Sequence, residues 1–157
     1  MYKIMFVCHG NICRSPMAEY IFKDLCEKQG VAQKYYISSS ATSREEIWNG
    51  IGNPVYSSAK AELKAHGISC DGKRAVQITA EDYKKYDLLV VMDSNNMRNL
   101  FKIVGNDTDG KIKKLMSFAD QNKDVSDPWY SGDFATCYQD ILLGCTALLK
   151  TLENECT

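Results

Sequence analysis

Short apolar runs alternate along the chain with longer segments in which apolar residues recur every three or four positions. Four short runs, at residues 3–7, 35–39, 87–92 and 112–116, predict β-strands. The run at 87–92 is apolar on both faces, which is typical of a central strand in a parallel sheet. Strands that alternate with helices predict an α/β fold, in which a parallel sheet is covered by helices on both faces.

The segments between the strands carry the spacing of amphipathic helices. The first helix is predicted over residues 16–29 and ends at Gly30, because glycine accepts the backbone geometry that follows a helix. A second helix is predicted over 54–65, and a capping box at 79–82 predicts the start of a short third one. The strongest apolar stripe covers 134–152 and predicts a long C-terminal helix that packs on the sheet.

The junction between the first strand and the first helix carries the candidate chemistry. Pro16 suits the first position of a helix and a serine can cap it, so a tight loop leads directly into a helix N-terminus. The backbone N–H groups of such a loop and the helix dipole together form a site for an anion. The planar guanidinium of Arg14 fits two oxygens of a phosphate. We therefore predict a phosphate-binding loop made of His9, Gly10, Asn11, Ile12, Cys13, Arg14 and Ser15.

Cys8 lies at the start of this loop and is the predicted nucleophile. A helix N-terminus and a nearby arginine favour the thiolate form of a cysteine, and the thiolate is the reactive form. A merely structural cysteine would not explain the glycine, asparagine and arginine that follow it. A metal site through Cys8 and Cys13 would need further ligands, but the chain has no second close cysteine pair and only two histidines, His9 and His66. We expect no metal and no cofactor.

The loop resembles the phosphate-binding loop of low-molecular-weight protein tyrosine phosphatases. Further along, Asp127-Pro128-Trp129-Tyr130 resembles the family's Asp-Pro-aromatic motif, and Met92-Asp93 resembles its Met-Asp element. This resemblance implies one domain over residues 1–157 with a four-stranded parallel sheet in the order 2-1-3-4. It also implies the hydrolysis of phosphotyrosine, in proteins or as small aryl phosphates, through a phosphocysteine on Cys8.

Asp127 is the predicted general acid and base. Cleavage of an aryl phosphate needs a proton for the leaving oxygen and later a base for the attacking water, and one carboxyl group can serve both steps. An Asp-Pro pair alone usually only starts a turn, but the two aromatic residues after it and the loop elsewhere favour the acid. The resemblance implies that Trp129 and Tyr130 border the substrate. Trp129 stands where the family usually has tyrosine, so Tyr130 alone keeps a phosphorylatable hydroxyl here.

The resemblance implies supporting roles for residues outside the loop. A hydrogen bond between Asn11 and Ser39 would hold the loop in shape. Asp93 would either contact the site or cap the helix that follows it, and capping is favoured. Lys73 stands where the family often has a histidine, and whether it takes over that role is open. Trp48 lies in a slightly lengthened loop; it would line the pocket mouth by resemblance, or simply pack against its neighbours.

The composition of the chain bears on its binding partners, its relation to membranes and the redox state of its cysteines. The chain has 157 residues and a net charge of −1, so nothing in its overall charge favours nucleic acid or an anionic membrane. No apolar run is long enough to span a bilayer, and the N-terminus lacks a signal-peptide arrangement. The odd number of cysteines, seven, favours reduced thiols over a disulfide scaffold. We expect a cytoplasmic monomer, and the resemblance implies a reversible disulfide between Cys13 and Cys8 that protects the nucleophile from over-oxidation.

Three other functions fit parts of this pattern. Arsenate reductases with a similar loop need a further cysteine pair near the third strand, whereas no cysteine lies between Cys70 and Cys137. Arginine phosphatases of this fold tend to carry threonine where Ile12 stands, so Ile12 favours phosphotyrosine. A phosphoprotein-binding module without activity would be expected to lack Cys8 or Asp127, and both are present.

Overall fold

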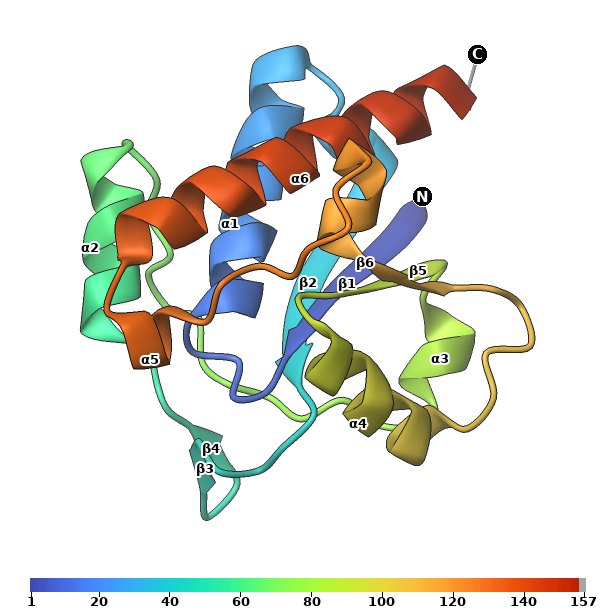
Figure 1. Ribbon diagram of the computed structural model, residues 1–157, viewed down its shortest axis with the longest axis horizontal. Coiled ribbons are helices and arrows are strands. Elements are labelled where there is room, and N and C mark those ends of the chain that lie inside the picture. Colours follow the sequence, from blue (N-terminus) through green and yellow to red (C-terminus); the bar gives the residue numbers. More distant parts are fainter. Residues whose placement is uncertain (156–157) are drawn as a thin grey trace.

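A four-stranded parallel sheet forms the centre of the computed structural model, which describes residues 1–155 (Figure 1). The strand order is β2-β1-β5-β6, which is the predicted order 2-1-3-4 counted over the strands of this sheet. Each neighbouring pair is parallel, as the alternation of strands and helices predicts. The strands are β1 (Tyr2–Cys8), β2 (Tyr35–Ala41), β5 (Leu88–Val91) and β6 (Ile112–Lys114).

Helices cover both faces of the sheet. The larger core, on one face, includes residues of α1 (Arg14–Gln29), α2 (Ser57–Ala65) and α6 (Phe134–Glu155). The second core includes residues of α3 (Asp82–Lys85) and α4 (Ser94–Val104). Figure 1 shows α1 and α6 crossing on one side of the strands and α3 and α4 on the other. The remaining elements are η1 (Ala32–Lys34), a hairpin of β3 (Ile47–Trp48) and β4 (Ile51–Gly52), η2 (Leu115–Ala119) and α5 (Pro128–Ser131).

The apolar pattern of β1 explains why the sheet is buried on both faces. Phe6 lies in the larger core, where its ring centroid is 5.7 Å from that of Phe22 of α1. Its neighbour Val7 points to the opposite face and belongs to the second core with Val91 and Leu100. Successive side chains of a strand alternate between faces, so an unbroken apolar run serves both cores. This packing holds the end of β1, and hence Cys8, between two layers of helices.

The helix and strand boundaries differ from the predictions where side chains have tertiary partners. Helix α1 begins at Arg14, and Ser15 lies inside its first turn. The Ser15 hydroxyl does not cap the helix, because it contacts the sulfur of Cys8. Helix α2 begins at Ser57, since Pro54 forms an isolated bridge with Arg74. The fourth strand ends at Lys114, and the two residues after it start the 3₁₀ helix η2.

Only part of the predicted capping box at 79–82 forms. The carboxylate of Asp82 accepts hydrogen bonds from the backbone N–H and the hydroxyl of Thr79, at 2.9 and 3.2 Å. The backbone N–H of Asp82 donates to the backbone carbonyl of Thr79 at 3.1 Å rather than to its hydroxyl, and α3 begins only at Asp82. Within residues 1–155, no helix is both long and apolar enough to cross a membrane.

Candidate active site

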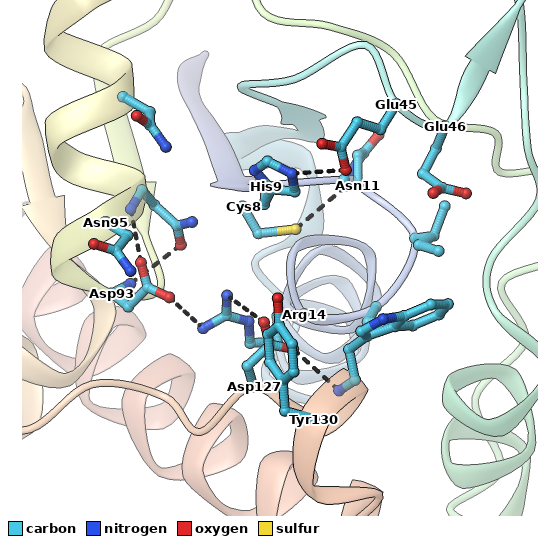
Figure 2. Close-up of a pocket in the computed structure, with 16 residues that line it drawn as sticks. Cys8, His9, Asn11, Arg14, Glu45, Glu46, Asp93, Asn95, Asp127 and Tyr130 are labelled. Carbon is cyan, nitrogen blue, oxygen red and sulfur yellow. Dashed lines mark hydrogen bonds and ion pairs between the residues drawn. The ribbon is translucent and has the colours of Figure 1, made fainter.

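A pocket of about 460 Å³ opens where the β1–α1 loop meets the N-terminal ends of α4 and α5 (Figure 2). The predicted loop residues from Cys8 to Arg14 line this pocket, and so do Asp93, Asp127 and Tyr130. The carboxyl ends of β1 and β5 point toward it, which is where ligand sites of parallel α/β sheets form. Residues distant in sequence therefore meet around one sulfur atom.

Cys8 is the last residue of β1, and its side chain is buried at the base of the loop. Its Sγ accepts hydrogen bonds from the backbone N–H groups of Asn11, at 3.3 Å, and Ser15, at 3.4 Å. The Oγ of Ser15 lies 3.0 Å from the same sulfur. Hydrogen-bond donors directed at a sulfur favour its charged form, because each bond strengthens when the acceptor is an anion. Two backbone N–H groups of the loop are therefore directed at the Cys8 sulfur.

Asn11 gives the loop its shape. Its φ is 59°, a left-handed conformation that a side chain other than glycine adopts at an energetic cost. Its Nδ2 donates to Ser15 Oγ at 2.8 Å and to Ser39 Oγ at 3.0 Å, so the hydrogen bond implied by the resemblance is present. Its Oδ1 accepts from the backbone N–H of Val76 at 3.1 Å. These three bonds hold a strained backbone with its N–H groups turned toward Cys8.

A buried polar layer lies behind Asn11. Ser39 Oγ donates to Glu19 Oε1 at 2.6 Å, and Glu19 is buried in α1 and paired with Lys23. Lys73 Nζ donates to the backbone carbonyl of Ser39 at 3.0 Å and lies 3.8 Å from Glu19 Oε1. Burial lowers the pKa of Lys73, and the charge of Glu19 opposes this shift. Lys73 thus contacts the layer that supports the loop, whereas Glu19 carries no motif that sequence analysis could have used.

Arg14 is buried in the floor of the pocket and has partners from two distant segments. Its Nη1 donates to the carbonyl of Val125 at 2.9 Å and lies 2.9 Å from Asp93 Oδ2, while Nη2 lies 3.5 Å from Asp127 Oδ2. Burial by itself lowers the pKa of Arg14, but the charges of Cys8, Asp93 and Asp127 outweigh burial and raise it. The guanidinium is therefore a permanent positive charge with a fixed plane.

Asp93 both caps a helix and contacts the site, so the two alternatives for this residue coexist. Its Oδ1 accepts from the backbone N–H of Asn96 at 2.7 Å, and Asn96 Oδ1 accepts from the backbone N–H of Asp93 at 3.2 Å. This capping box starts α4 and orients the carboxylate. The second oxygen, Oδ2, is then directed at Arg14.

Asp127 is the N-cap of the short helix α5. Its Oδ1 accepts from the backbone N–H of Trp129 at 3.0 Å, and Pro128 occupies the first helical position. The other oxygen, Oδ2, lies 3.5 Å from Arg14 Nη2, and the side chain is 33% exposed. Trp129 and Tyr130 line the rim and are exposed, at 55% and 87%. Asp127 is thus fixed by one oxygen and open to the pocket by the other.

Trp48 does not line the pocket, and it does not pack against a core. This loop contains a hairpin, in which Asn49 and Gly50 have φ values of 51° and 76° and reverse the chain. The hairpin carries the Trp48 side chain into solvent, where 79% of its surface is exposed. Trp48 is therefore not among the residues that line this pocket, and its partner across the hairpin is Ile51.

Several residues around the pocket escaped sequence analysis. His9 Nε2 lies 2.9 Å from Glu45 Oε2, and Glu46 Oε1 accepts from Asn53 Nδ2 at 3.0 Å. Glu45 and Glu46 both line the pocket, although their sequence context indicates only a polar loop. The polar side chains of α4 that face the pocket could have been found, because they follow the carboxyl end of a buried strand. These are Asn95, Asn96 and Asn99.

Cys13 is a buried residue of the same loop and immediately precedes α1. Burial, with the negative charges of Cys8 and Asp127, raises the pKa of Cys13 to about 12. Cys13 therefore remains a neutral thiol near pH 7. The two cysteines of the loop consequently differ in environment, since the donors described above converge on Cys8 alone.

The fold and the pocket together define a small α/β protein with an anion-binding loop between a strand and a helix. A family model described as "Low molecular weight phosphotyrosine protein phosphatase" matches residues 3–157. The chain belongs to this family, and it is accordingly a protein tyrosine phosphatase of the low-molecular-weight class, a hydrolase.

The chain is similar to individual curated relatives and to solved structures. The chain is 38% identical over 157 residues to the low molecular weight protein-tyrosine-phosphatase YfkJ of Bacillus subtilis, which covers 99% of this chain and 98% of that protein. It is 37% identical over 152 residues to the human low molecular weight phosphotyrosine protein phosphatase, with 94% and 93% of the two chains covered. The crystal structure of YfkJ matches with a TM-score of 0.92, covering 99% and 96%. The crystal structure of a Drosophila arginine phosphatase matches with a TM-score of 0.84 and 29% identity, covering 96% and 97%.

Proposed function

We propose that the protein hydrolyses phosphotyrosine and small aryl phosphates through a phosphocysteine on Cys8. The observation that carries this proposal is the convergence of three groups on one pocket. Cys8 Sγ accepts two backbone N–H bonds, Arg14 is buried in the floor of the same pocket, and Asp127 Oδ2 lies 3.5 Å from Arg14 Nη2. These are a nucleophile, a phosphate ligand and a proton donor, which together suffice for phosphoryl transfer without a metal.

In the first step, the Cys8 thiolate attacks phosphorus and the bond to the phenolic oxygen breaks. Asp127 donates its proton to that oxygen, so the leaving group departs as a neutral phenol. Arg14 and the N–H groups of the loop bind the phosphoryl oxygens, which carry the negative charge in the transition state. Asp93 is a positioning residue, because its ion pair at 2.9 Å sets the plane of the Arg14 guanidinium.

In the second step, the Asp127 carboxylate takes a proton from water while the water oxygen attacks phosphorus. The P–S bond breaks, inorganic phosphate leaves, and Cys8 returns as a thiolate. The bonds from the backbone of Asn11 and Ser15 stabilise this thiolate as a leaving group, as they stabilise it before attack. One carboxyl group thus alternates between acid and base.

The walls of the pocket support phosphotyrosine over phosphoarginine. Ile12 gives the loop an apolar side chain, and the exposed rings of Trp129 and Tyr130 stand at the rim. An aromatic ring gains from contact with these apolar and aromatic walls, whereas a guanidinium group would have to pair with the carboxylates that also line the pocket, Glu45 and Glu46. The fold alone does not discriminate, since a Drosophila arginine phosphatase shares it.

We also propose that a disulfide protects the nucleophile. Peroxide would oxidise the Cys8 thiolate to a sulfenic acid, and the Cys13 sulfur would then attack Cys8 sulfur and release water. Because the pKa of Cys13 is about 12, this step needs loss of its proton and should accelerate with rising pH. Mass spectrometry of peroxide-treated protein should find a Cys8–Cys13 link, and a sulfinic acid on Cys8 in its place would contradict the proposal. We further infer a monomer that works in the cytoplasm.

The decisive experiment compares the wild type with Cys8→Ser on p-nitrophenyl phosphate and on matched phosphotyrosine and phosphoarginine peptides. The wild type should hydrolyse the first two, in the presence of a chelator as well as without it, and should trap a phosphoenzyme on Cys8. Cys8→Ser should be inactive, whereas Cys70→Ser, which changes a buried cysteine of the core, should retain activity. Activity in Cys8→Ser, or preference for phosphoarginine, would refute the proposal.

A further inference from the structure

Tyr56 directly precedes α2, and its side chain contacts two elements that follow Asp127 in the chain. Its ring makes an edge contact with the ring of Trp129 in α5, at a centroid distance of 4.9 Å and an interplanar angle of 63°. The same ring stacks with that of Phe134, the first residue of α6, at 5.9 Å and 23°. Figure 1 shows the N-terminal end of α2 next to α5. These three residues form one aromatic cluster, which joins α2 to both α5 and α6.

The backbone of Tyr56 is bonded to the phosphate-binding loop. Its N–H donates to the carbonyl of Ile12 at 2.9 Å, and Ile12 belongs to the loop and lines the pocket. The carbonyl of Tyr56 accepts from the backbone N–H of Lys60 at 2.9 Å, which is the first hydrogen bond of α2. Two backbone hydrogen bonds thus hold Tyr56 between the loop and α2, while its side chain contacts the helix that Asp127 caps.

Helix α5 depends on tertiary contacts for its position. It has four residues, whereas isolated helices shorter than about 12–15 residues are marginal in water. Pro128 is buried, but Trp129 and Tyr130 are exposed, so little of this helix is packed into a core. The ring contact between Trp129 and Tyr56 is therefore one of the contacts that fix α5 against the rest of the molecule.

The position of α5 decides where the carboxyl group of Asp127 lies. Its Oδ1 accepts from the backbone N–H of Trp129 at 3.0 Å, so a displacement of Trp129 moves the bond that orients the carboxyl group. The contact of its Oδ2 with Arg14, at 3.5 Å, is longer than an ordinary hydrogen bond and restrains the group less. Tyr56 is not one of the residues that line the pocket, so its effect on the reaction would pass through Trp129 and Asp127.

We propose that Tyr56 is a positioning residue for the general acid, because it holds α5, and with it Asp127, at a fixed place relative to the Cys8 loop. This inference rests on the proposed function, since it requires Asp127 to give its proton to the phenolic oxygen as the S–P bond forms and the P–O bond breaks. The ring of Tyr56 carries the role, because both aromatic contacts are made by the ring. A catalytic group that is misplaced by about 1 Å can cost ~10²-fold in rate, so a loosened α5 slows the reaction although Asp127 is intact.

The test measures kcat/KM on phenyl phosphate, whose leaving oxygen needs a proton, and on p-nitrophenyl phosphate, whose activated leaving group needs little help. Tyr56→Ala should lose about tenfold on phenyl phosphate and less than about twofold on p-nitrophenyl phosphate. Tyr56→Phe keeps the ring and should match the wild type on both substrates. Tyr36→Ala is the matched control, because Tyr36 is a half-exposed tyrosine of β2 whose ring pairs with that of Tyr86 at 6.1 Å. It should leave both values unchanged.

A second variant removes the same ring contact from the other side. Trp129→Ala changes an exposed side chain, so the test does not depend on whether Tyr56→Ala folds. It should lower kcat/KM on phenyl phosphate more than on p-nitrophenyl phosphate, as Tyr56→Ala does. An equal loss on the two substrates in Trp129→Ala would contradict the proposal, because it would show that this contact does not act through the leaving-group proton.

A double-mutant cycle with Asp127→Asn separates positioning of the acid from a general loss of stability. When Asp127→Asn has removed the proton, adding Tyr56→Ala should cost little more on phenyl phosphate, because both substitutions affect the same step. Additive losses in the cycle, equal losses on the two phosphates in Tyr56→Ala, or no loss at all would overturn the proposal for Tyr56. An Asp127→Asn variant with wild-type activity on both phosphates is a different outcome, since it would refute Asp127 as the acid in the proposed function and the role of Tyr56 with it.

Discussion

At the scale of single residues, Asn11 shows how one side chain sets the geometry of a site. Its amide makes three hydrogen bonds, two to serine hydroxyls and one to the backbone of Val76. These bonds offset a left-handed backbone that costs about 1 kcal/mol or more. The backbone N–H of the same residue donates to Cys8 Sγ. The backbone geometry of Asn11 is therefore coupled directly to the sulfur of Cys8.

We predict that Asn11→Ala lowers kcat/KM on p-nitrophenyl phosphate at least tenfold, because the loop N–H groups lose their alignment. A change of this size corresponds to about 1.4 kcal/mol of transition-state stabilisation. Asn49→Ala is the matched control, since Asn49 has a similar φ of 51° but lies at the hairpin tip. It should lose comparable backbone stability and keep its activity on this small substrate. Equal activities in the two variants would show that the amide of Asn11 has no part in catalysis.

At the scale of elements, the N-terminus of α5 joins a structural role to a chemical one. Asp127 caps this four-residue helix with one oxygen and turns the other to Arg14. Asparagine caps a helix about as well as aspartate but cannot donate a carboxyl proton. The substitution Asp127→Asn therefore separates the two roles.

We predict that Asp127→Asn loses about 10²–10⁴-fold in single-turnover rate on phosphotyrosine, the range of general acid catalysis. The loss should be smaller for the phosphorylation step on p-nitrophenyl phosphate, because its activated leaving group needs little help from a proton. Inorganic phosphate should inhibit the variant at least as well as the wild type, since a negative charge has been removed. Equal losses for both leaving groups, with the fold intact, would place the acid elsewhere.

At the scale of the whole molecule, buried thiols make the free energy of unfolding depend on pH in the alkaline range. Burial raises the pKa of Cys13 and of Cys26 to about 12, whereas an exposed thiol ionises near 9.0. Between these values the native state binds more protons than the unfolded state. The neutral thiols therefore make their full contribution to the free energy of unfolding below about pH 9, and this contribution declines as pH rises toward 12.

We predict that the free energy of unfolding, from urea titrations under reducing conditions, falls between pH 8 and pH 10.5. Each buried thiol contributes a slope of up to ~1.4 kcal/mol per pH unit above its unfolded pKa. Cys26→Ala should be less stable at pH 8 but should show a shallower decline. Ile21→Val, which removes a buried methyl group and no titratable group, should lower stability and keep the wild-type slope. The same slope in all three proteins would exclude this linkage for Cys26.

Comparison of the sequence with the structure shows which features are local. The alternation of apolar runs with helical spacing sufficed for the parallel sheet and its helices, because each element carries its own period. Residues 8–16 sufficed for the anion-binding loop, since the donors, the arginine and the cysteine are contiguous. The strand order and the substrate class came from resemblance to a family, and neither could be read from periodicity.

The convergence of distant groups was decided by tertiary structure alone. Asp93 and Asp127 contact Arg14 although they lie far along the chain from it. The backbone N–H of Val76 donates to the side chain of Asn11, and the Trp48 side chain is exposed to solvent. Local preferences are set by neighbouring residues, but these contacts depend on how the helices pack on the sheet and on how a lengthened loop folds back on itself. The sequence by itself determined the chemistry of the loop, and the packing of the whole chain determined which carboxylates face it.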